Sequence, residues 1–199
     1  CTQEEMKKVQ GNRGILKKVS EKLKLTEKPI YTEYQMYDEQ IFQMDHKILE
    51  GYWACEAYYA DIMPVLQEKL EFPVSPNEKN RKIAEKMHGC NSVSIHIRRG
   101  DYLTEENQAM FGGICTEEYY EKAIAYMKDT VKDARFFVFS DDPAYAKKKY
   151  KGKEYTIIDI NSGKDSFYDM YLMSRCKHNI CANSTFSFWG ARLNKNAGK

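Results

Sequence analysis

The sequence lacks the features that identify several common classes of protein. It contains no apolar run of about 18 residues and no stretch with the charge, apolar core and cleavage site of a signal peptide. The glycine-rich dinucleotide and Walker motifs do not occur, nor do G-x-S-x-G and H-E-x-x-H. These absences argue against a membrane-spanning helix, a dinucleotide or P-loop enzyme, an α/β-hydrolase and a zinc protease.

The sequence also has little net charge, because 31 basic and 29 acidic side chains leave an excess of only +2. This small excess does not predict binding to nucleic acid, and the basic run at residues 147–149, 151 and 153 is typical of a solvated helix face. The six cysteines form no C-x-x-C pair, so neither a zinc site nor a disulfide framework is indicated. Reduced thiols fit best with a cytoplasmic protein.

The two ends of the chain suggest a piece of a longer protein. Its first residue is Cys1 and residues 196–199 form no obvious closing element. We therefore expect a fragment, in which a targeting or membrane-contacting part of the full-length protein would not be visible. The 199 residues, 42% of them hydrophobic, still suffice for a folded domain with its own core.

Residues 1–88 have an irregular and mostly helical pattern. Residues 1–30 are charged and helical in tendency, although Gly11 and Gly14 interrupt the periodicity. The other expected elements are a short strand and turn in residues 47–53, a helix over 58–70, a linker over 72–76 and a helix over 77–88. We place a domain boundary between residues 88 and 89.

After this boundary, strands and helices alternate four times. The expected strands are residues 92–97, 135–140, 154–159 and 178–182, and the expected helices are residues 116–129, 143–150, 165–175 and 187–194. Short apolar strands in such alternation predict right-handed crossovers and a parallel sheet covered by helices on both faces. Residues 89–199 are therefore expected to form a Rossmann-like α/β domain.

Polar loops follow all four expected strands. They comprise residues 98–101, 141–142, 161–164 and 183–185. Ligands of open α/β sheets bind beyond the carboxyl ends of the strands, so these loops predict one binding edge. Asp141 and Asp142 could bind a metal, but Pro143 directly after them favours a turn that begins a helix.

Two adjacent arginines, Arg98 and Arg99, leave the first of these strands. Side chains of consecutive residues point in different directions, so one arginine can bind a ligand phosphate while the other pairs with Asp101 or with a neighbouring loop. The alternative is that both make only structural ion pairs. His96 precedes them on the same strand and differs from the other histidines, which have no metal-ligand spacing.

Further candidates lie at the end of the last strand and on the helix before it. Ser184, Thr185 and Ser187 precede or begin a helix, where hydroxyls and free backbone N–H groups can bind an anion, or can simply cap the helix. Asp169 could accept two hydrogen bonds from N1 and N2 of guanine, or could be an ordinary solvated carboxylate. Together with Arg98, these hydroxyls favour binding of a diphosphate.

Residues 94–102, Ser-Ile-His-Ile-Arg-Arg-Gly-Asp-Tyr, resemble the H-x-R-R-G-D-Y signature of the α-1,2-fucosyltransferases of glycosyltransferase family 11. Residues 139–142 and 169–191 look like the two downstream motifs of that family. Residues 49–53 resemble its D-G-Y-W segment, with Glu50 where aspartate is more usual. The resemblance covers roughly residues 48 to 193 and consists of several motifs in the family order.

The resemblance implies a two-domain GT-B-like fold and a transferase that uses GDP-fucose without a metal or cofactor. Arg98 would hold the β-phosphate, and Arg99 is a further donor-binding candidate. His96 and Asp169 would lie beside the guanosine. The hydroxyls of Ser184, Thr185 or Ser187 would hold the phosphate from the other side.

On the same resemblance, residues 1–88 are the remnant of an acceptor-side domain, and residues 89–199 are the GDP-fucose-binding domain. The acceptor would be an oligosaccharide or galactoside, and the full-length protein could associate peripherally with the inner face of a membrane. The family's glycine-rich opening with its Gly-Asn-Gln loop is not in this sequence. We therefore keep open a catalytically inert module that binds a GDP-sugar.

The implied reaction is a direct displacement that inverts the anomeric centre. Arg98 would neutralise the leaving diphosphate, and Asp101 is the first choice for the base, with Glu105 and Glu106 as rivals. Asp101 could instead be only the structural partner of Arg99. A fucosyltransferase of another linkage, or a transferase for another guanosine diphosphate sugar, is the enzymatic alternative.

Overall fold

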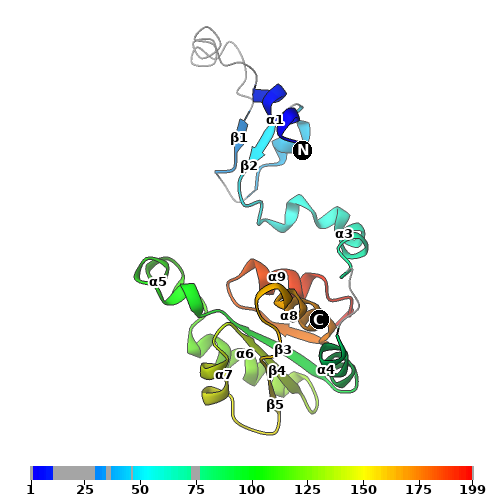
Figure 1. Ribbon diagram of the computed structural model, residues 1–199, viewed down its shortest axis with the longest axis vertical. Coiled ribbons are helices and arrows are strands. Elements are labelled where there is room, and N and C mark those ends of the chain that lie inside the picture. The colour runs from blue at the N-terminus through cyan, green and yellow to red at the C-terminus, as the bar shows by residue number, and fades with distance from the viewer. Residues whose placement is uncertain (1, 11–29, 35–36, 46, 73–76, 199) are drawn as a thin grey trace. The chain divides into compact units, whose positions relative to one another are not determined.

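The computed structural model describes residues 2–10, 30–34, 37–45, 47–72 and 77–198. These residues form two compact units, Cys1–Leu66 and Gln67–Lys199 (Figure 1). Of the helix expected within residues 1–30, only α1, Gln3–Gln10, lies among the described residues. Most of the expected linker, residues 73–76, lies outside them.

The first unit contains a small parallel sheet that the sequence did not predict in full. Strand β2, Ile48–Glu50, was expected, but its pairing with β1, Ile30–Thr32, was not. The other elements are 3-10 helices and the start of an α-helix: η1 Glu39–Gln43, η2 Glu56–Tyr58, η3 Ala60–Ile62 and α3 Met63–Lys69.

The turn expected after β2 is confirmed, and one carboxylate organises it. Oε2 of Glu33 accepts hydrogen bonds from the backbone N–H groups of Tyr52 and Trp53, both at 2.9 Å. A Cβ atom at Gly51 would lie 2.5 Å from Cβ of Glu33. Trp53 has a φ of 51°, in the left-handed region that side chains rarely adopt. The turn therefore depends on a glycine and on a carboxylate 18 residues before it in the chain.

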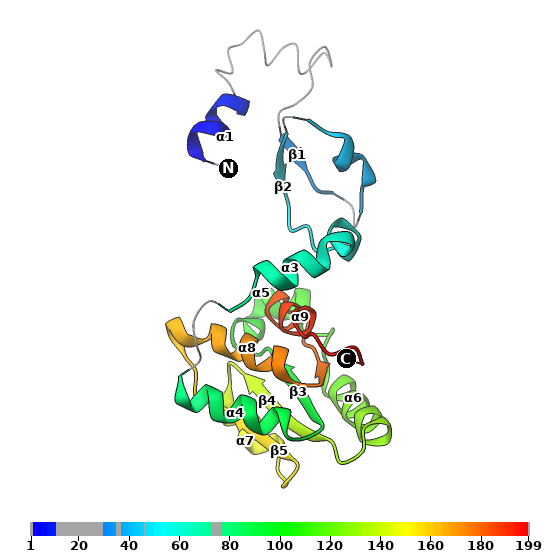
Figure 2. The same cartoon turned by 90° about the vertical axis from the view of Figure 1, so that its right-hand side faces the viewer.

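The second unit is built on a four-stranded parallel sheet, as predicted. Its strands are β3 Ser92–Ile97, β4 Arg135–Ser140, β5 Tyr155–Ile158 and β6 His178–Ile180. They lie in the order β5-β4-β3-β6. Figure 2 shows the neighbouring strands β3, β4 and β5 of this sheet. The α-helices that flank or follow them are α4 Glu78–His88, α5 Glu105–Phe111, α6 Glu117–Thr130, α7 Pro143–Lys149, α8 Phe167–Arg175 and α9 Thr185–Arg192.

Alternate residues of the strands pack into two hydrophobic cores. On one face, apolar side chains of β3 and β4 pack against α6 and α7, around Val138 and Ile124. On the other face, Phe137 and Phe139 of β4 pack against α4 and α8, around Met87 and Leu172. The prediction of a parallel sheet covered by helices on both faces is therefore confirmed.

One face of β3 is polar although it is fully covered. Ser92, Ser94 and His96 share the face that carries the second core. Their partners come from the segment that leads into β6 and from β6 itself, because Oγ of Ser92 accepts from the N–H of Lys177 and Oγ of Ser94 accepts from Nδ2 of Asn179. These hydrogen bonds satisfy the hydroxyls of both buried serines. His96 is the last polar side chain before the carboxyl end of the strand.

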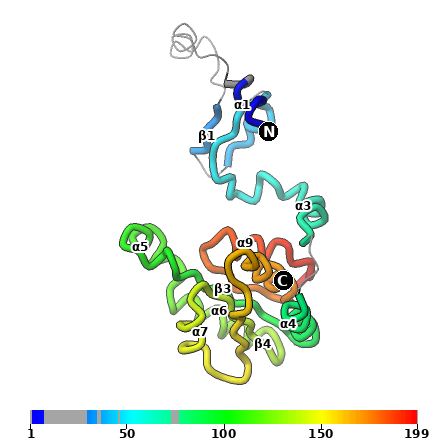
Figure 3. Tube along the Cα trace, in the orientation of Figure 1, coloured from blue at the N-terminus to red at the C-terminus, as the bar shows by residue number. Residues whose placement is uncertain are grey.

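Two details of the organisation differ from the expectation. Helix α4 packs on the sheet through Met87, so it lies with the second unit, whereas the domain boundary had been placed after residue 88. Helix α5, together with the 3-10 helix η4 (Gly100–Leu103), was not predicted. Figure 3 shows α5 lying away from the sheet, and its Met110 is 66% exposed, so it carries little of the amphipathic signal that identifies a packed helix.

The second core should contribute strongly to the stability of this unit. Leu172 is fully buried between α8 and the sheet, so Leu172→Ala is expected to lower the free energy of unfolding by about 2–5 kcal/mol. Urea unfolding followed by circular dichroism measures this change. The matched control, Met110→Ala on exposed α5, should change it by no more than about 0.5 kcal/mol. Equal effects of the two substitutions would contradict the assignment of this core.

Candidate functional site

The predicted polar loops meet along one edge of the sheet. Because all four strands are parallel and adjacent, their carboxyl ends lie on the same side. Ile97 of β3 pairs with Ser140 of β4, which places the loop beginning at Arg98 beside the loop beginning at Asp141. The edge therefore brings together basic and acidic side chains that lie more than 40 residues apart in the chain.

Arg98 lies between two carboxylates at this edge. Its Nη2 is 2.8 Å from Oδ1 of Asp101, and its Nη1 is 2.9 Å from Oδ2 of Asp141. The guanidinium also lies over the ring of Tyr102, 5.8 Å from the centroid. About a third of the Arg98 side chain remains exposed, so a cation is held in a fixed place at the mouth of the site.

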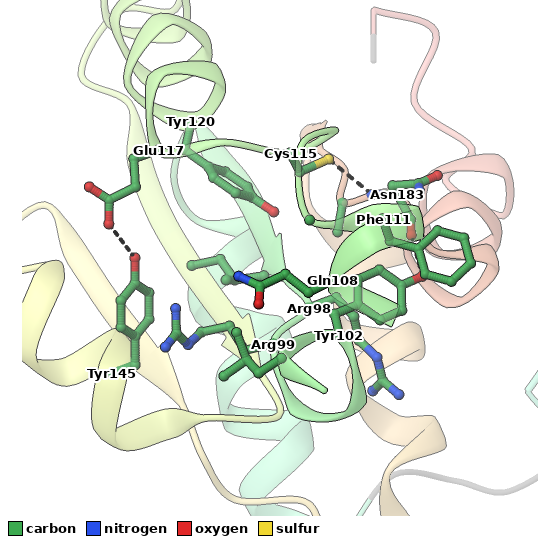
Figure 4. Close-up of a pocket in the computed structure, with 14 residues that line it drawn as sticks. Arg98, Arg99, Tyr102, Gln108, Phe111, Cys115, Glu117, Tyr120, Tyr145 and Asn183 are labelled. Atoms are coloured by element: carbon green, nitrogen blue, oxygen red, sulfur yellow. Dashed lines mark hydrogen bonds between the residues drawn. The ribbon is translucent and has the colours of Figure 1, made fainter. Parts of the chain in front are cut away.

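Arg99 points in the other direction, as Figure 4 shows. Its guanidinium stacks on Tyr145 at 3.8 Å from the ring centroid, and its Nε donates to Oδ2 of Asp142 at 3.2 Å. The prediction that the two arginines diverge is confirmed. The alternative that Asp101 is the structural partner of Arg99 is wrong, because Asp101 pairs with Arg98 and Asp142 pairs with Arg99.

A cavity of about 140 Å³ is lined in part by both arginines, and Figure 4 shows Arg99 turned toward Tyr145 and Arg98 pointing to the opposite side. Its walls combine aromatic and polar side chains from β3, α5, α6 and α7 and from the loop after β6. The lining includes the side chains of Tyr102, Gln108, Phe111, Glu117 and Tyr145. Phe111 stacks on Tyr102 at 4.9 Å, so the helix that the sequence analysis missed contributes a wall of the cavity.

His96 is buried just behind Arg98. Its Nδ1 has no hydrogen-bond partner within the described part of the chain, and its ring lies 5.6 Å from that of Phe186. Burial lowers the pKa of His96 to about 4, and the positive charge of Arg98 lowers it too, whereas the carboxylate of Asp141 acts in the opposite direction. His96 is therefore neutral near pH 7 and offers an unsatisfied ring nitrogen.

Asp169, in the first turn of α8, ends a chain of amide hydrogen bonds. Its Oδ1 accepts from Nδ2 of Asn161, which also donates to Oδ1 of Asn80. Nδ2 of Asn80 donates back to Asn161 and to Oδ1 of Asn77, which caps α4. At that cap, Oδ1 of Asn77 accepts from the backbone N–H of Asn80, so the side-chain atom of Asn80 that contacts it must be the donor Nδ2. Each later bond of the chain, as far as Asp169, then has a fixed donor and a fixed acceptor.

The environment of Asp169 changes its acidity. Burial raises the pKa of this carboxyl from 3.8 to about 6, although the hydrogen bond from Asn161 acts to lower it. A carboxylate that is held by one amide and is poorly solvated gains more from a ligand donor than an exposed one does. Asp169 is thus not the ordinary solvated helix carboxylate that we had kept as the alternative.

The three predicted hydroxyls differ in what they contact. Ser187 is buried, and its Oγ accepts from the N–H of Ala182, so this hydroxyl already supports the loop after β6. Ser184 is the N-cap residue of α9 but makes no side-chain capping bond there. Thr185 is exposed at the first position of the helix. Ser184 and Thr185 therefore have the better placement for a ligand at this helix end.

The structure brings some of the predicted residues together and leaves others apart. Arg98 and Asp101 are in direct contact, and His96 is within electrostatic reach of Arg98. Asp169 makes its hydrogen bond with Asn161, not with any of the predicted residues. Glu105 and Glu106, the rival bases, are exposed in the first turn of α5.

Sequence reasoning also missed contributors to the site. Asp141 and Asn161 were expected at the binding edge only as members of its polar loops, with a turn favoured for Asp141, and neither Asn80 nor Tyr145 was a candidate. The adjacent carboxylates at residues 141–142 were the only signal for Asp141, because its contact with Arg98 depends on which strands are neighbours.

No group of three or more potential metal ligands occurs within the described residues. None of the helices in that part of the chain is long and apolar enough to span a membrane.

This fold and this edge define a class of protein. A parallel sheet with arginines, hydroxyls and a helix N-terminus at its carboxyl edge is suited to a phosphorylated ligand. α/β domains that bind nucleotides share these features.

Residues 14–198 match the family described as "Glycosyl transferase family 11", and the chain belongs to that family. It is 39% identical over 146 residues to an α-1,2-colitosyltransferase of Escherichia coli, covering 72% of this chain and 50% of that protein. It is 45% identical over 106 residues to the O-antigen biosynthesis glycosyltransferase WbnK of Escherichia coli, covering 53% and 35%.

Mammalian relatives are more distant. Galactoside α-(1,2)-fucosyltransferase 2 of Oryctolagus cuniculus is 26% identical over 103 residues, covering 51% of this chain and 29% of that protein. The chain is thus homologous to galactoside α-1,2-fucosyltransferases, and its matches span half or less of the length of these relatives. No solved structure matches it.

Proposed function

We propose that this chain is part of a transferase that moves L-fucose from GDP-fucose to a galactose-type hydroxyl of a glycan, in α-1,2 linkage. The single observation that carries the proposal is Arg98. It is the first residue after β3, it stands within the family's H-x-R-R-G-D-Y signature, and its guanidinium is partly exposed at the carboxyl edge. An arginine held there can bind the diphosphate of the donor bidentately.

The second unit would bind the donor. Arg98 holds the β-phosphate from one side, while Ser184 and Thr185, at the N-terminus of α9, hold it from the other. Neutral His96 and the carboxylate of Asp169 lie beside the guanosine, and Asp169 accepts hydrogen bonds from N1 and N2 of the base. Within a GT-B-like arrangement, the acceptor-side domain would include the residues that precede this unit.

The reaction would proceed by direct displacement with inversion and would need no metal. The acceptor oxygen attacks C1 of fucose, the bond from C1 to the phosphate oxygen breaks, and GDP leaves with the electron pair. Arg98 stabilises the charge that develops on the leaving diphosphate. Asp101 takes the proton from the acceptor hydroxyl, with Glu105 and Glu106 as alternatives. We infer a cytoplasmic protein that, at full length, associates peripherally with the inner face of a membrane.

Calorimetric titration with GDP and ADP tests the donor-binding part of the proposal. GDP should bind at least about tenfold more tightly than ADP, because adenine offers Asp169 no pair of donors at the same place. Equal binding of the two nucleotides would contradict the assignment. Linkage analysis of the product made by the full-length protein then tests the α-1,2 linkage, and a turnover assay on the 199-residue chain tests whether it is an inert binding module.

A second donor sugar is favoured by one observation, the 39% identity with an α-1,2-colitosyltransferase. Colitose is fucose without its 3-hydroxyl, so both GDP-sugars present the same diphosphate and base. Competition between GDP-fucose and GDP-colitose in the full-length protein distinguishes them. A clear preference for GDP-colitose would replace fucose in the proposal and leave the roles of Arg98 and Asp169 unchanged.

A further inference from the structure

The two carboxylates that contact Arg98 are held in different ways. Asp141 makes two contacts, because Oδ2 lies 2.9 Å from Nη1 of Arg98 and Oδ1 accepts from the backbone N–H of Arg99 at 2.9 Å. It directly follows β4, whose last residue pairs with the last residue of β3. A Cβ atom at Gly100 would lie 2.6 Å from Oδ2 of Asp141, so the backbone also leaves room for this carboxylate.

Asp101 has a looser carboxylate on a fixed backbone. Its side chain is 53% exposed, against 25% for Asp141, and its carboxylate contacts Nη2 of Arg98 at 2.8 Å. The backbone oxygen of Asp101 accepts from Oγ1 of Thr104 and from Nδ2 of Asn107, both at 3.0 Å. The carboxylate can therefore rotate away from Arg98 without disturbing the turn that carries it.

Charge makes such a rotation necessary when a diphosphate binds. One guanidinium between two carboxylates gives a local charge of −1, which repels an anionic ligand. A phosphate that approaches Arg98 competes with Asp101 and Asp141 for the same N–H donors. Asp101 is the one that leaves at lower cost, because it is more exposed and loses a single contact.

We propose that the two carboxylates have opposite effects on donor binding: Asp141 positions Arg98 for the diphosphate, and Asp101 is displaced from Arg98 by the diphosphate. This inference rests on the proposed function, in which Arg98 binds the donor. Asp101 is then without its cation only in the donor complex, where it can take the proton of the acceptor hydroxyl. Donor binding and activation of the base are thereby coupled through one arginine.

Three substitutions, each of which removes one negative charge, test this inference in GDP titrations of the 199-residue chain. Asp101→Asn, which removes the competitor, should bind GDP about tenfold more tightly than the wild type. Asp141→Asn keeps an acceptor for the N–H of Arg99 but loses the charge that orients Arg98, and it should bind about tenfold more weakly. Glu85→Gln removes the same negative charge from the exposed face of α4, where Glu85 pairs with Arg81, and should shift the affinity by less than about threefold.

Guanosine, which has no phosphate, separates positioning from a general loss of structure. Asp141→Asn should bind guanosine as the wild type does, whereas a merely structural role would weaken both ligands. In a full-length protein, Asp101→Asn should lower the KM for the donor together with kcat, and Asp141→Asn should raise the KM.

Shifts in the same direction for Asp101→Asn and Asp141→Asn would overturn the inference alone, provided that the wild type binds GDP and Arg98→Ala does not. Equal GDP binding by the wild type and Arg98→Ala, or no binding by the wild type, would overturn the inference together with the proposed function.

Discussion

Arg98→Ala is expected to weaken GDP binding by about a hundredfold to a thousandfold. The substitution removes two donors that can make charge-assisted hydrogen bonds to phosphate, each worth about 1.5–3 kcal/mol. It also leaves Asp101 and Asp141 without their shared cation at the same edge, so the remaining charge repels the ligand. Calorimetric titration of GDP measures the loss directly.

Two further variants show whether the effect belongs to the site. Arg98→Lys keeps the charge but not the planar fork of donors, so it should recover only part of the affinity. Arg81→Ala removes an arginine from the exposed face of α4, where it pairs with Glu85, and should leave GDP binding unchanged. Wild-type affinity in Arg98→Ala would remove the basis of the donor-site assignment, provided that thermal unfolding shows an intact fold.

The sheet could be predicted because its signals are local. Runs such as residues 92–97 and 135–140 combine β-branched or aromatic side chains with short length, and each is followed by a helix with an N-cap or an N1 proline. The structure confirms these strands residue for residue. Strand β1 was missed because three residues that pair with a strand 18 positions later carry no periodic signal of their own.

The site was predictable only in part, since some of its contacts join loops that are far apart in the chain. Arg98 and Asp101, three residues later, could be identified from one segment, but the contact with Asp141 exists because β4 is the neighbour of β3. In the same way, Asn80 and Asn161 meet across 81 residues. Side chains of this kind are ordinary in sequence and become recognisable only when the strand order is known.

Asp169→Asn is expected to make the chain more stable and, at the same time, less able to select guanine. The pKa of Asp169 in the folded chain, about 6, lies above its ordinary value of 3.8. Between these values the native state binds the proton more tightly than the unfolded state does, so stability falls as the pH rises through this window. Asparagine cannot ionise, and the variant should gain about 1–3 kcal/mol at pH 7.5.

Urea unfolding at two pH values checks the stability gain. At pH 7.5 the asparagine variant should have the higher free energy of unfolding, and near pH 4 the difference should largely disappear, because wild-type Asp169 is then mostly protonated. Asn161→Ala serves as a contrast, since it removes the amide that donates to Asp169 and should lower stability at pH 7.5. A destabilised Asp169→Asn at pH 7.5 would show that the ionised carboxylate is better solvated than its burial indicates.

Binding should change in the opposite direction, because the ionised carboxylate offers guanine two acceptor oxygens and the asparagine amide offers one. Asp169→Asn is therefore expected to lose about tenfold or more in GDP affinity, with little change for ADP. In the wild type, GDP affinity should fall as the pH is lowered through about 6, where Asp169 takes up its proton. A preference for GDP that does not depend on pH would place guanine recognition at another residue. Loss of the preference on protonation or on substitution would instead identify Asp169 as a carboxylate that favours ligand binding and lowers the stability of the fold.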